Sequence, residues 1–164
     1  MIESSNGEML KVKKGLGGWL ILVAIGVIFS PLRIIAELNI YLEIFNDGTW
    51  EALTLQSSEF YNPLFGVIVC FEIIGNCALV IAYIYLIFLF FKEKQNFPKI
   101  YIITILANTA FILIDALFCK VVFPTEPMFD AETTKMVVQS VVACAIWIPY
   151  MRMSVRVKNT FINL

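Results

Sequence analysis

The chain has 164 residues, of which 60% are hydrophobic and 15% are charged, and its formal net charge is −1. A soluble domain carries about 25% charged residues and could not keep this much apolar surface from water. The composition therefore excludes a disordered chain, a nucleic-acid-binding protein and a secreted disulfide scaffold, and it indicates an integral membrane protein. The chain has no His, and its four Cys show no metal-ligand spacing. We therefore expect neither a metal site nor a cofactor.

Four apolar runs approach or exceed the length of about 20 residues that a membrane-spanning helix needs. They cover residues 15–32, 64–91, 100–118 and 136–151. These runs predict an all-α, polytopic integral membrane protein, with residues 1–164 forming a single four-helix membrane domain. Pro31 and Pro149 lie near the ends of the first and fourth runs, where proline kinks or stops a helix. In the second run, Gly75, Ala78 and Ala82 recur at helical spacing, which favours close packing against another helix.

The connection over residues 33–63 is the longest, and residues 119–135 form a second, shorter one. From Ile34 to Phe45 the longer connection repeats apolar residues at helical spacing, with Glu37 and Glu43 between them. This pattern predicts either an amphipathic helix on the outer membrane face or a continuation of the first span beyond Pro31. Its role is either a lid or docking element, or a connector that covers the mouth of the bundle, and we favour the connector.

Charged residues flank the four runs unevenly. Most basic residues lie before the first run, between the second and third, and after the fourth: Lys11, Lys13, Lys14, Lys92, Lys94, Lys99, Arg152, Arg156 and Lys158. Acidic residues favour the two other connections: Glu37, Glu43, Asp47, Glu51, Glu59, Glu126, Asp130 and Glu132. The positive-inside rule then predicts cytoplasmic termini and two external connections, over residues 33–63 and 119–135.

A second role for the flanking residues is contact with lipid. Trp19 lies at the cytoplasmic boundary of the first run, where Trp is a common interface anchor. Arg152, Arg156 and Lys158 either attract anionic lipid or only fix the topology.

Glu72 and Asp115 are acidic residues inside predicted spans, where ionisable groups are rare and usually functional. Asn76 lies one turn after Glu72, and Asn108 lies about two turns before Asp115. The second and third helices run in opposite directions. Counting residues from their outer ends therefore gives Glu72 the depth of Asp115, and Asn76 the depth of Asn108. We predict that each pair faces across one helix interface.

Two carboxylates this close in a low dielectric cannot both stay ionised, so either a proton is shared or a cation is held between them. Arg33 and Lys120 are the candidate cations, because both lie near the outer boundary and have long side chains. The functional interpretation is a proton or ion relay, or a polar pocket for a small substrate. The structural one is that hydrogen bonds between these side chains only fix the helix register.

Several short stretches of the chain resemble a known family. Gly15-Leu16-Gly17-Gly18-Trp19-Leu20 opens the first run, Ser30-Pro31-Leu32-Arg33 closes it, and Phe71-Glu72 lies early in the second. The tail reads Trp147-Ile148-Pro149-Tyr150-Met151, then Ser154-Val155-Arg156-Val157-Lys158-Asn159-Thr160-Phe161. In these residues the chain resembles the bacterial membrane proteins grouped as domain of unknown function 2569. The resemblance implies a four-helix protein of the bacterial inner membrane, and it implies no activity or catalytic residues.

Three functions compete. A non-enzymatic protein that binds or supports a partner, either another membrane protein or a second copy, suits four helices with short inner connections. A small oligomeric transporter or a proton- or ion-coupled permease would use Glu72 and Asp115 for coupling, and it would need two copies to enclose a pathway. An intramembrane enzyme would use them as an acid–base pair, but no catalytic motif supports it. We predict the first function and no enzymatic activity.

Overall fold

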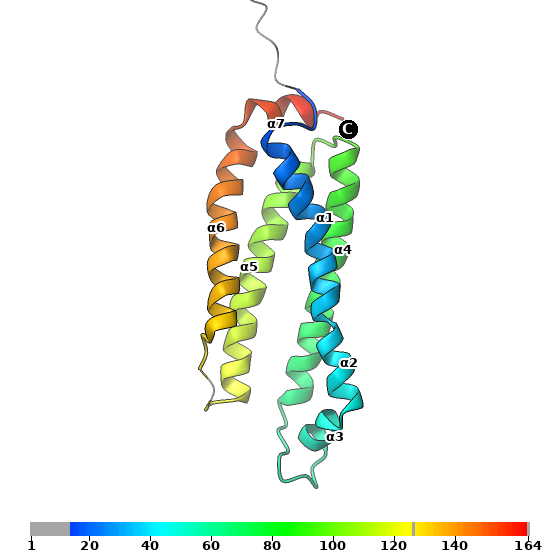
Figure 1. Ribbon diagram of the computed structural model, residues 1–164, viewed down its shortest axis with the longest axis vertical. Coiled ribbons are helices and arrows are strands. Elements are labelled where there is room, and N and C mark those ends of the chain that lie inside the picture. Colours follow the sequence, from blue (N-terminus) through cyan, green and yellow to red (C-terminus); the bar gives the residue numbers. More distant parts are fainter. Residues whose placement is uncertain (1–13, 126, 164) are drawn as a thin grey trace, which may run out of the picture.

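The computed structural model describes residues 14–125 and 127–163, and its long elements are all helices (Figure 1). In chain order they are α1 (Trp19–Glu37), α2 (Asn39–Asn46), α3 (Thr49–Thr54), α4 (Phe65–Phe91), α5 (Phe97–Val122), α6 (Ala131–Met153) and α7 (Val155–Thr160). Four helical segments, the first of them α1 with α2, are long and apolar enough to cross a membrane. This confirms the predicted all-helical class and the prediction of four helices that are long and apolar enough to span a membrane.

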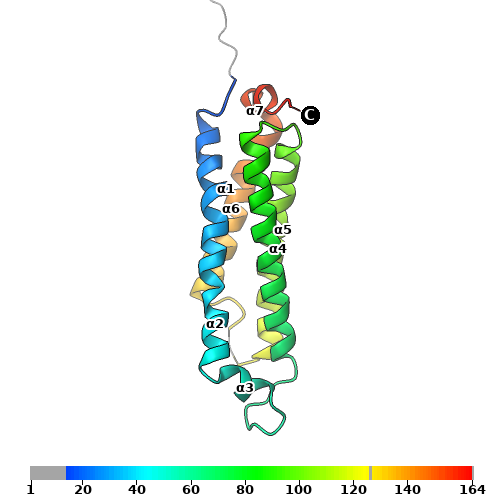
Figure 2. The same ribbon diagram turned by 90° about the vertical axis from the view of Figure 1, so that its right-hand side faces the viewer.

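The helices form an elongated bundle (Figures 1 and 2). The start of α1 lies beside α7 at one end, called the α7 end below, whereas α3 and the loop between α5 and α6 lie at the opposite α3 end. Along the bundle α1 packs against α4, α4 against α5, and α5 against α6. Lys11, Lys13 and Glu126, which entered the charge argument, lie outside the described residues.

The first span extends beyond its predicted end at residue 32. α1 continues through Pro31 to Glu37, and the Leu38 N–H donates to the Ile34 carbonyl at 3.0 Å, so the helical path leads directly into α2. Proline removes one N–H and more often kinks a helix than ends it, and the residues after Pro31 include good helix formers. The connection predicted over residues 33–63 is therefore helical up to Asn46.

The other spans agree with the predicted ranges to different degrees. α4 begins one residue later than predicted and ends at Phe91, as predicted. α5 extends over 97–122 because Pro98 occupies its first turn, where the missing N–H costs no helical hydrogen bond. α6 starts at Ala131, because the Asp130 carboxylate accepts the Thr133 N–H at 2.6 Å and caps the helix. The connection predicted over residues 119–135 is shortened to 123–130.

Two clusters of buried apolar side chains hold the bundle. The larger lies toward the α7 end and includes Leu20, Leu86, Phe90, Phe97 and Phe161. The rings of Phe97 and Phe161 stack with centroids 4.5 Å apart, and Phe90 contacts both. The smaller cluster joins α4 to α5 near the α3 end.

Much of the apolar surface instead faces outward. On α4, Val67, Ile74 and Ile81 are 65, 69 and 68% exposed, and their spacing of seven puts them on one face. A soluble protein rarely exposes an apolar stripe of this kind, whereas a membrane protein needs one for contact with lipid.

The tail closes the α7 end of the bundle. The Gly15 N–H donates to Thr160 Oγ1 at 2.9 Å, and Asn163 exchanges backbone hydrogen bonds with Glu93 and Gln95 in the turn between α4 and α5. The Arg156 guanidinium covers Gly17, where a Cβ atom would lie 2.7 Å from Nη1. The glycine-rich stretch and the tail, both quoted above for the family resemblance, are thus in contact.

Candidate functional site

The packing of α4 against α5 brings Glu72 and Asp115 together in the half of the bundle nearer the α3 end. One carboxylate oxygen of each residue and Cys119 Sγ all lie within 4.8 Å of one another, and the three side chains are partly buried. Cys119 follows Asp115 by four residues, so both project from the same face of α5. These atoms are close enough together for one small cation to contact all three.

Tyr41 brings α2 into this site. Its hydroxyl donates to Glu72 Oε2 at 2.8 Å, and the Cys119 thiol donates to Glu72 Oε1 at 4.0 Å. Asp115 Oδ1, by contrast, is buried and accepts no hydrogen bond from any described residue. Buried polar atoms are nearly always hydrogen-bonded, so this oxygen calls for a donor, from a proton on the neighbouring carboxyl group or from a bound species.

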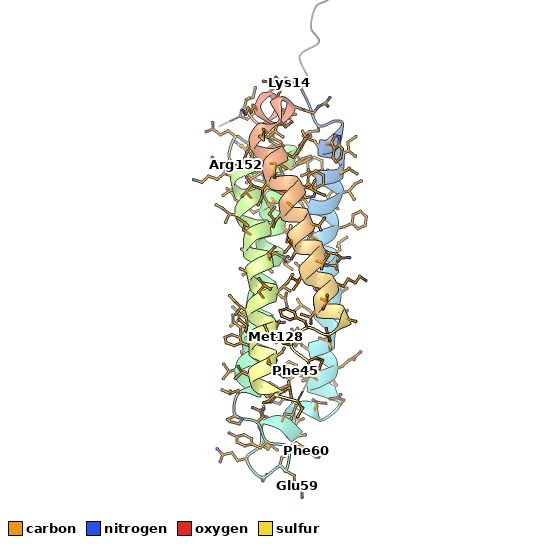
Figure 3. All side chains as sticks on the ribbon, turned by 90° about the vertical axis from the view of Figure 1, so that its left-hand side faces the viewer. Lys14, Phe45, Glu59, Phe60, Met128 and Arg152 are labelled. Carbon is orange, nitrogen blue, oxygen red and sulfur yellow. The ribbon has the colours of Figure 1, made fainter. Side chains whose placement is uncertain are left out.

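A cavity of about 520 Å³ adjoins Asp115. It is bounded by α1 and α2 on one side and by α5 and α6 on the other. Figure 3 views the bundle from the side of α6, with the labelled Phe45 and Met128 toward the α3 end. Polar side chains from five helices line it: Arg33, Glu37, Asn39, Tyr41, Glu43, Asn76, Asn108, Asp115, Glu132 and Thr133. We call this space the acidic cavity. Asp115 therefore borders an open polar space and is not sealed in a dry helix interface.

Two further cavities adjoin the acidic cavity. One of about 660 Å³ shares Arg33 and Asn108 with it and extends between α1 and α6 to Tyr83 and Gln139. Another, of about 220 Å³, reaches Asp115 from the loop between α5 and α6. Toward the α7 end, the larger buried cluster closes the bundle. These three cavities thus lie away from the α7 end, where a separate cavity of about 510 Å³ between α5 and α6 is lined by Lys99 and Arg152.

The predicted site residues take three kinds of position. Glu72 and Asp115 lie together, and Asn76 and Asn108 both line the acidic cavity. Arg33 also lines this cavity, and its Nε lies 3.5 Å from Glu37 Oε1 in a half-exposed ion pair. Lys120 lines the smallest cavity with Asp115, and its Nζ donates to the Pro124 carbonyl at 2.7 Å.

The predicted interface residues lie at the α7 end. Trp19 is 61% exposed, and its ring contacts that of Trp147 with centroids 6.2 Å apart. Arg152 and Lys158 are exposed, whereas Arg156 is partly buried against the glycines at the start of α1.

Sequence reasoning missed Tyr41 and Cys119. Tyr41 belongs to a segment predicted as an external connection, so its hydroxyl was not counted among the intramembrane groups. Cys119 is the first residue of the connection predicted over residues 119–135, so its thiol is not expected within a span, although its spacing of four from Asp115 puts both on one helix face.

Fold and site together define a polytopic α-helical membrane protein with a polar cavity between its spans. The family model described as "Protein of unknown function (DUF2569)" matches residues 13–162, and the chain belongs to this family. The chain is also similar to the inner membrane protein YdgK of Escherichia coli (strain K12). The two are 25% identical over 154 residues, which cover 90% of this chain and 94% of that protein. No solved structure matches the chain.

Proposed function

We propose that this chain is a non-enzymatic protein of the bacterial inner membrane that binds a ligand or a partner protein in the acidic cavity. The cavity itself carries the proposal, because polar side chains that only fix helix register need no open space beside them. Its volume of about 520 Å³ lies in the range typical of ligand sites, and polar groups from several helices converge on it. The sequence contains no His and no catalytic motif, which favours binding over catalysis.

We further propose that the α7 end faces the cytoplasm, so that the acidic cavity lies toward the external side. The support is the distribution of charge, since basic residues flank the spans at the α7 end and acidic residues flank them at the α3 end. The similar Escherichia coli protein is an inner membrane protein, which supports the same membrane for this chain.

Photo-crosslinking from within the cavity tests the binding function. A photoreactive phenylalanine analogue replaces Met136, which lines the acidic cavity, and the control carries it at the exposed Val138 on the same helix. Illumination of native membranes is expected to give an adduct of defined mass at residue 136 that the control does not give. Identical lipid adducts at both positions, with no additional product, would contradict the proposal.

A permease is the second candidate, and a specific observation favours it. The acidic cavity borders Asp115, whose carboxyl group lies beside that of Glu72, and it shares Arg33 and Asn108 with the cavity between α1 and α6. Toward the α7 end the larger buried cluster fills the bundle, as expected for a pathway open to one side. Liposomes that hold the protein should then conduct protons or take up solute, and the Glu72→Gln/Asp115→Asn variant should not. Unchanged flux in this variant, judged against Glu51→Gln on α3 as control, would remove the permease.

A further inference from the structure

We propose that the acidic cavity binds an organic ammonium ion, with the ammonium group at Asp115 and an apolar body against the walls of the cavity. The inference rests on the proposed binding function and deepens it by naming the class of ligand. Three properties of the lining residues lead to it: their net charge, an unpaired acceptor atom, and the apolar side chains between them.

The charge of the lining favours a cation. Four carboxyl groups from four helices line the cavity, namely Glu37, Glu43, Asp115 and Glu132. Arg33 is the basic side chain among the described lining residues, and it pairs with Glu37. The other three carboxyl groups therefore have no basic partner within the lining. Glu37, Glu43 and Glu132 are exposed and partly screened by water, whereas Asp115 is partly buried, so the field that attracts a positively charged solute is strongest at Asp115.

Hydrogen bonding favours a cation that carries N–H donors. The Asp115 carboxylate belongs to the lining, and its Oδ1 is buried without a donor among the described residues; the amide side chains of Asn76 and Asn108 line the same cavity and can turn their carbonyl oxygens toward a donor. An ammonium group offers up to three donors and no acceptor, so it can satisfy the carboxylate and amide oxygens together. Such a charge-assisted hydrogen bond is stronger than one between neutral groups.

The apolar part of the lining favours an organic cation over a metal ion. Ile34, Ile40, Phe111, Ile112 and Met136 form the rest of the walls. A small inorganic cation would fill little of the 520 Å³ and would leave these side chains without contact. An ammonium group attached to a hydrocarbon body would bury apolar surface against them, and the ring of Phe111 can also attract the cation.

Two sources could supply this chemistry, a soluble amine or the ammonium headgroup of a lipid. The adjoining cavity between α1 and α6 is lined by Phe29 and Leu32, which are 62 and 56% exposed, so the seam between these helices borders the membrane. A lipid headgroup could enter there, whereas a soluble amine would enter from the α3 end. The experiment below separates the two sources.

The test titrates the purified full chain in detergent micelles with benzylammonium chloride and follows binding by calorimetry. Benzyl alcohol and benzoate are neutral and anionic probes of the same size. We expect benzylammonium to bind about tenfold more tightly than benzyl alcohol, and benzoate not to bind, because one charge-assisted contact is worth about that factor. Equal affinity for the charged and the neutral probe would overturn the proposal.

Variants show whether the cavity is responsible. Asp115→Asn keeps the size of the side chain and should weaken benzylammonium binding about tenfold, with little change for benzyl alcohol. Glu132→Gln, on the opposite wall, should weaken benzylammonium binding less than Asp115→Asn does. If Asp115→Asn does not fold, Glu132→Gln serves as the cavity variant. The matched control is Glu51→Gln on α3, which should bind as the unaltered protein does. Unchanged benzylammonium affinity in a folded cavity variant would overturn the proposal.

Nanodiscs identify the source of the ligand. If it is a lipid headgroup, discs of phosphatidylethanolamine should compete and weaken benzylammonium binding relative to discs of phosphatidylglycerol. If it is a soluble amine, the affinity should be equal in both discs. A specific adduct at residue 136 without ammonium binding would retain the proposed function and reject only this inference.

Discussion

Gly75 on α4 packs directly against the ring of Phe111 on α5, so a methyl group there should separate the two helices. A Cβ atom at Gly75 would lie 2.1 Å from Cε2 and 2.5 Å from Cζ of Phe111. Ordinary contacts begin near 3.4 Å, so the Phe111 ring or its helix must move by about 1.3 Å. The ring cannot simply swing aside, because it packs against Phe71 with centroids 5.2 Å apart.

Gly26 provides the matched control, since it also lies within a helix but a Cβ atom there would meet nothing within 4 Å. Overpacking costs about 1–3 kcal/mol, whereas replacing Gly by Ala within a helix gains up to about 1 kcal/mol. The free energy of unfolding of Gly75→Ala should therefore lie about 2 kcal/mol below that of Gly26→Ala. Unfolding by sodium dodecyl sulfate in mixed micelles, followed by circular dichroism, measures this difference.

A second substitution tests the cause of the loss. Phe111→Leu should cost less in the Gly75→Ala background than in the unaltered protein, because a smaller side chain relieves the overlap. Glu72 lies one turn before Gly75 on α4, so the same displacement should also weaken ligand binding in the acidic cavity. Equal stability of Gly75→Ala and Gly26→Ala, or additive effects of the two substitutions, would refute the reasoning.

The remaining predictions concern single hydrogen bonds. Tyr41→Phe removes the 2.8 Å bond to Glu72 and should lower the free energy of unfolding by about 1 kcal/mol in the same titration. Thr160→Val leaves the Gly15 N–H without its acceptor and should speed proteolysis at the glycine-rich stretch, measured against the unaltered chain. The hydrogen bond from the third N–H of α6 lowers the pKa of Asp130, so its stabilisation should be present at neutral pH and lost as the pH falls through that lowered pKa. Asp130→Ala should therefore be less stable than the unaltered protein at neutral pH and match it in acid. An equal difference at all pH values would contradict this.

The sequence predicts the spans well because an apolar run that crosses a bilayer must be long, and hydrogen bonding within the segment forces it into a helix. The end of the first span is harder to predict. Pro31 resembles a stop signal, yet a proline removes one hydrogen bond, and the apolar and acidic residues that follow continue the helix to Asn46. Gly75 belongs to a stripe of small residues that indicates close packing, although only the structure identifies Phe111 as the contact.

The candidate site also has parts that the sequence predicts and parts that only the structure shows. Counting residues from the helix ends is sufficient to put Glu72 near Asp115, because a short turn joins two antiparallel helices and thereby limits their relative shift. The same reasoning cannot find Tyr41, whose place depends on the helical path beyond Pro31. Nor can it find the acidic cavity, because this cavity depends on how the helices pack. α6 packs against α5, whereas cavities remain between α6 and α1.

The proposed function requires an acidic, water-accessible cavity between the spans, and thiol labelling tests this most directly. In a background with all four Cys replaced, Cys is introduced at Met136 in the cavity or at the exposed Val138. The protein is placed in nanodiscs, where both faces are open to reagent. A cationic trimethylammonium methanethiosulfonate should modify Met136→Cys faster than the anionic sulfonate reagent does, and both should scarcely modify Val138→Cys in lipid. Resistance of Met136→Cys to both reagents, or faster modification by the anion, would contradict the account.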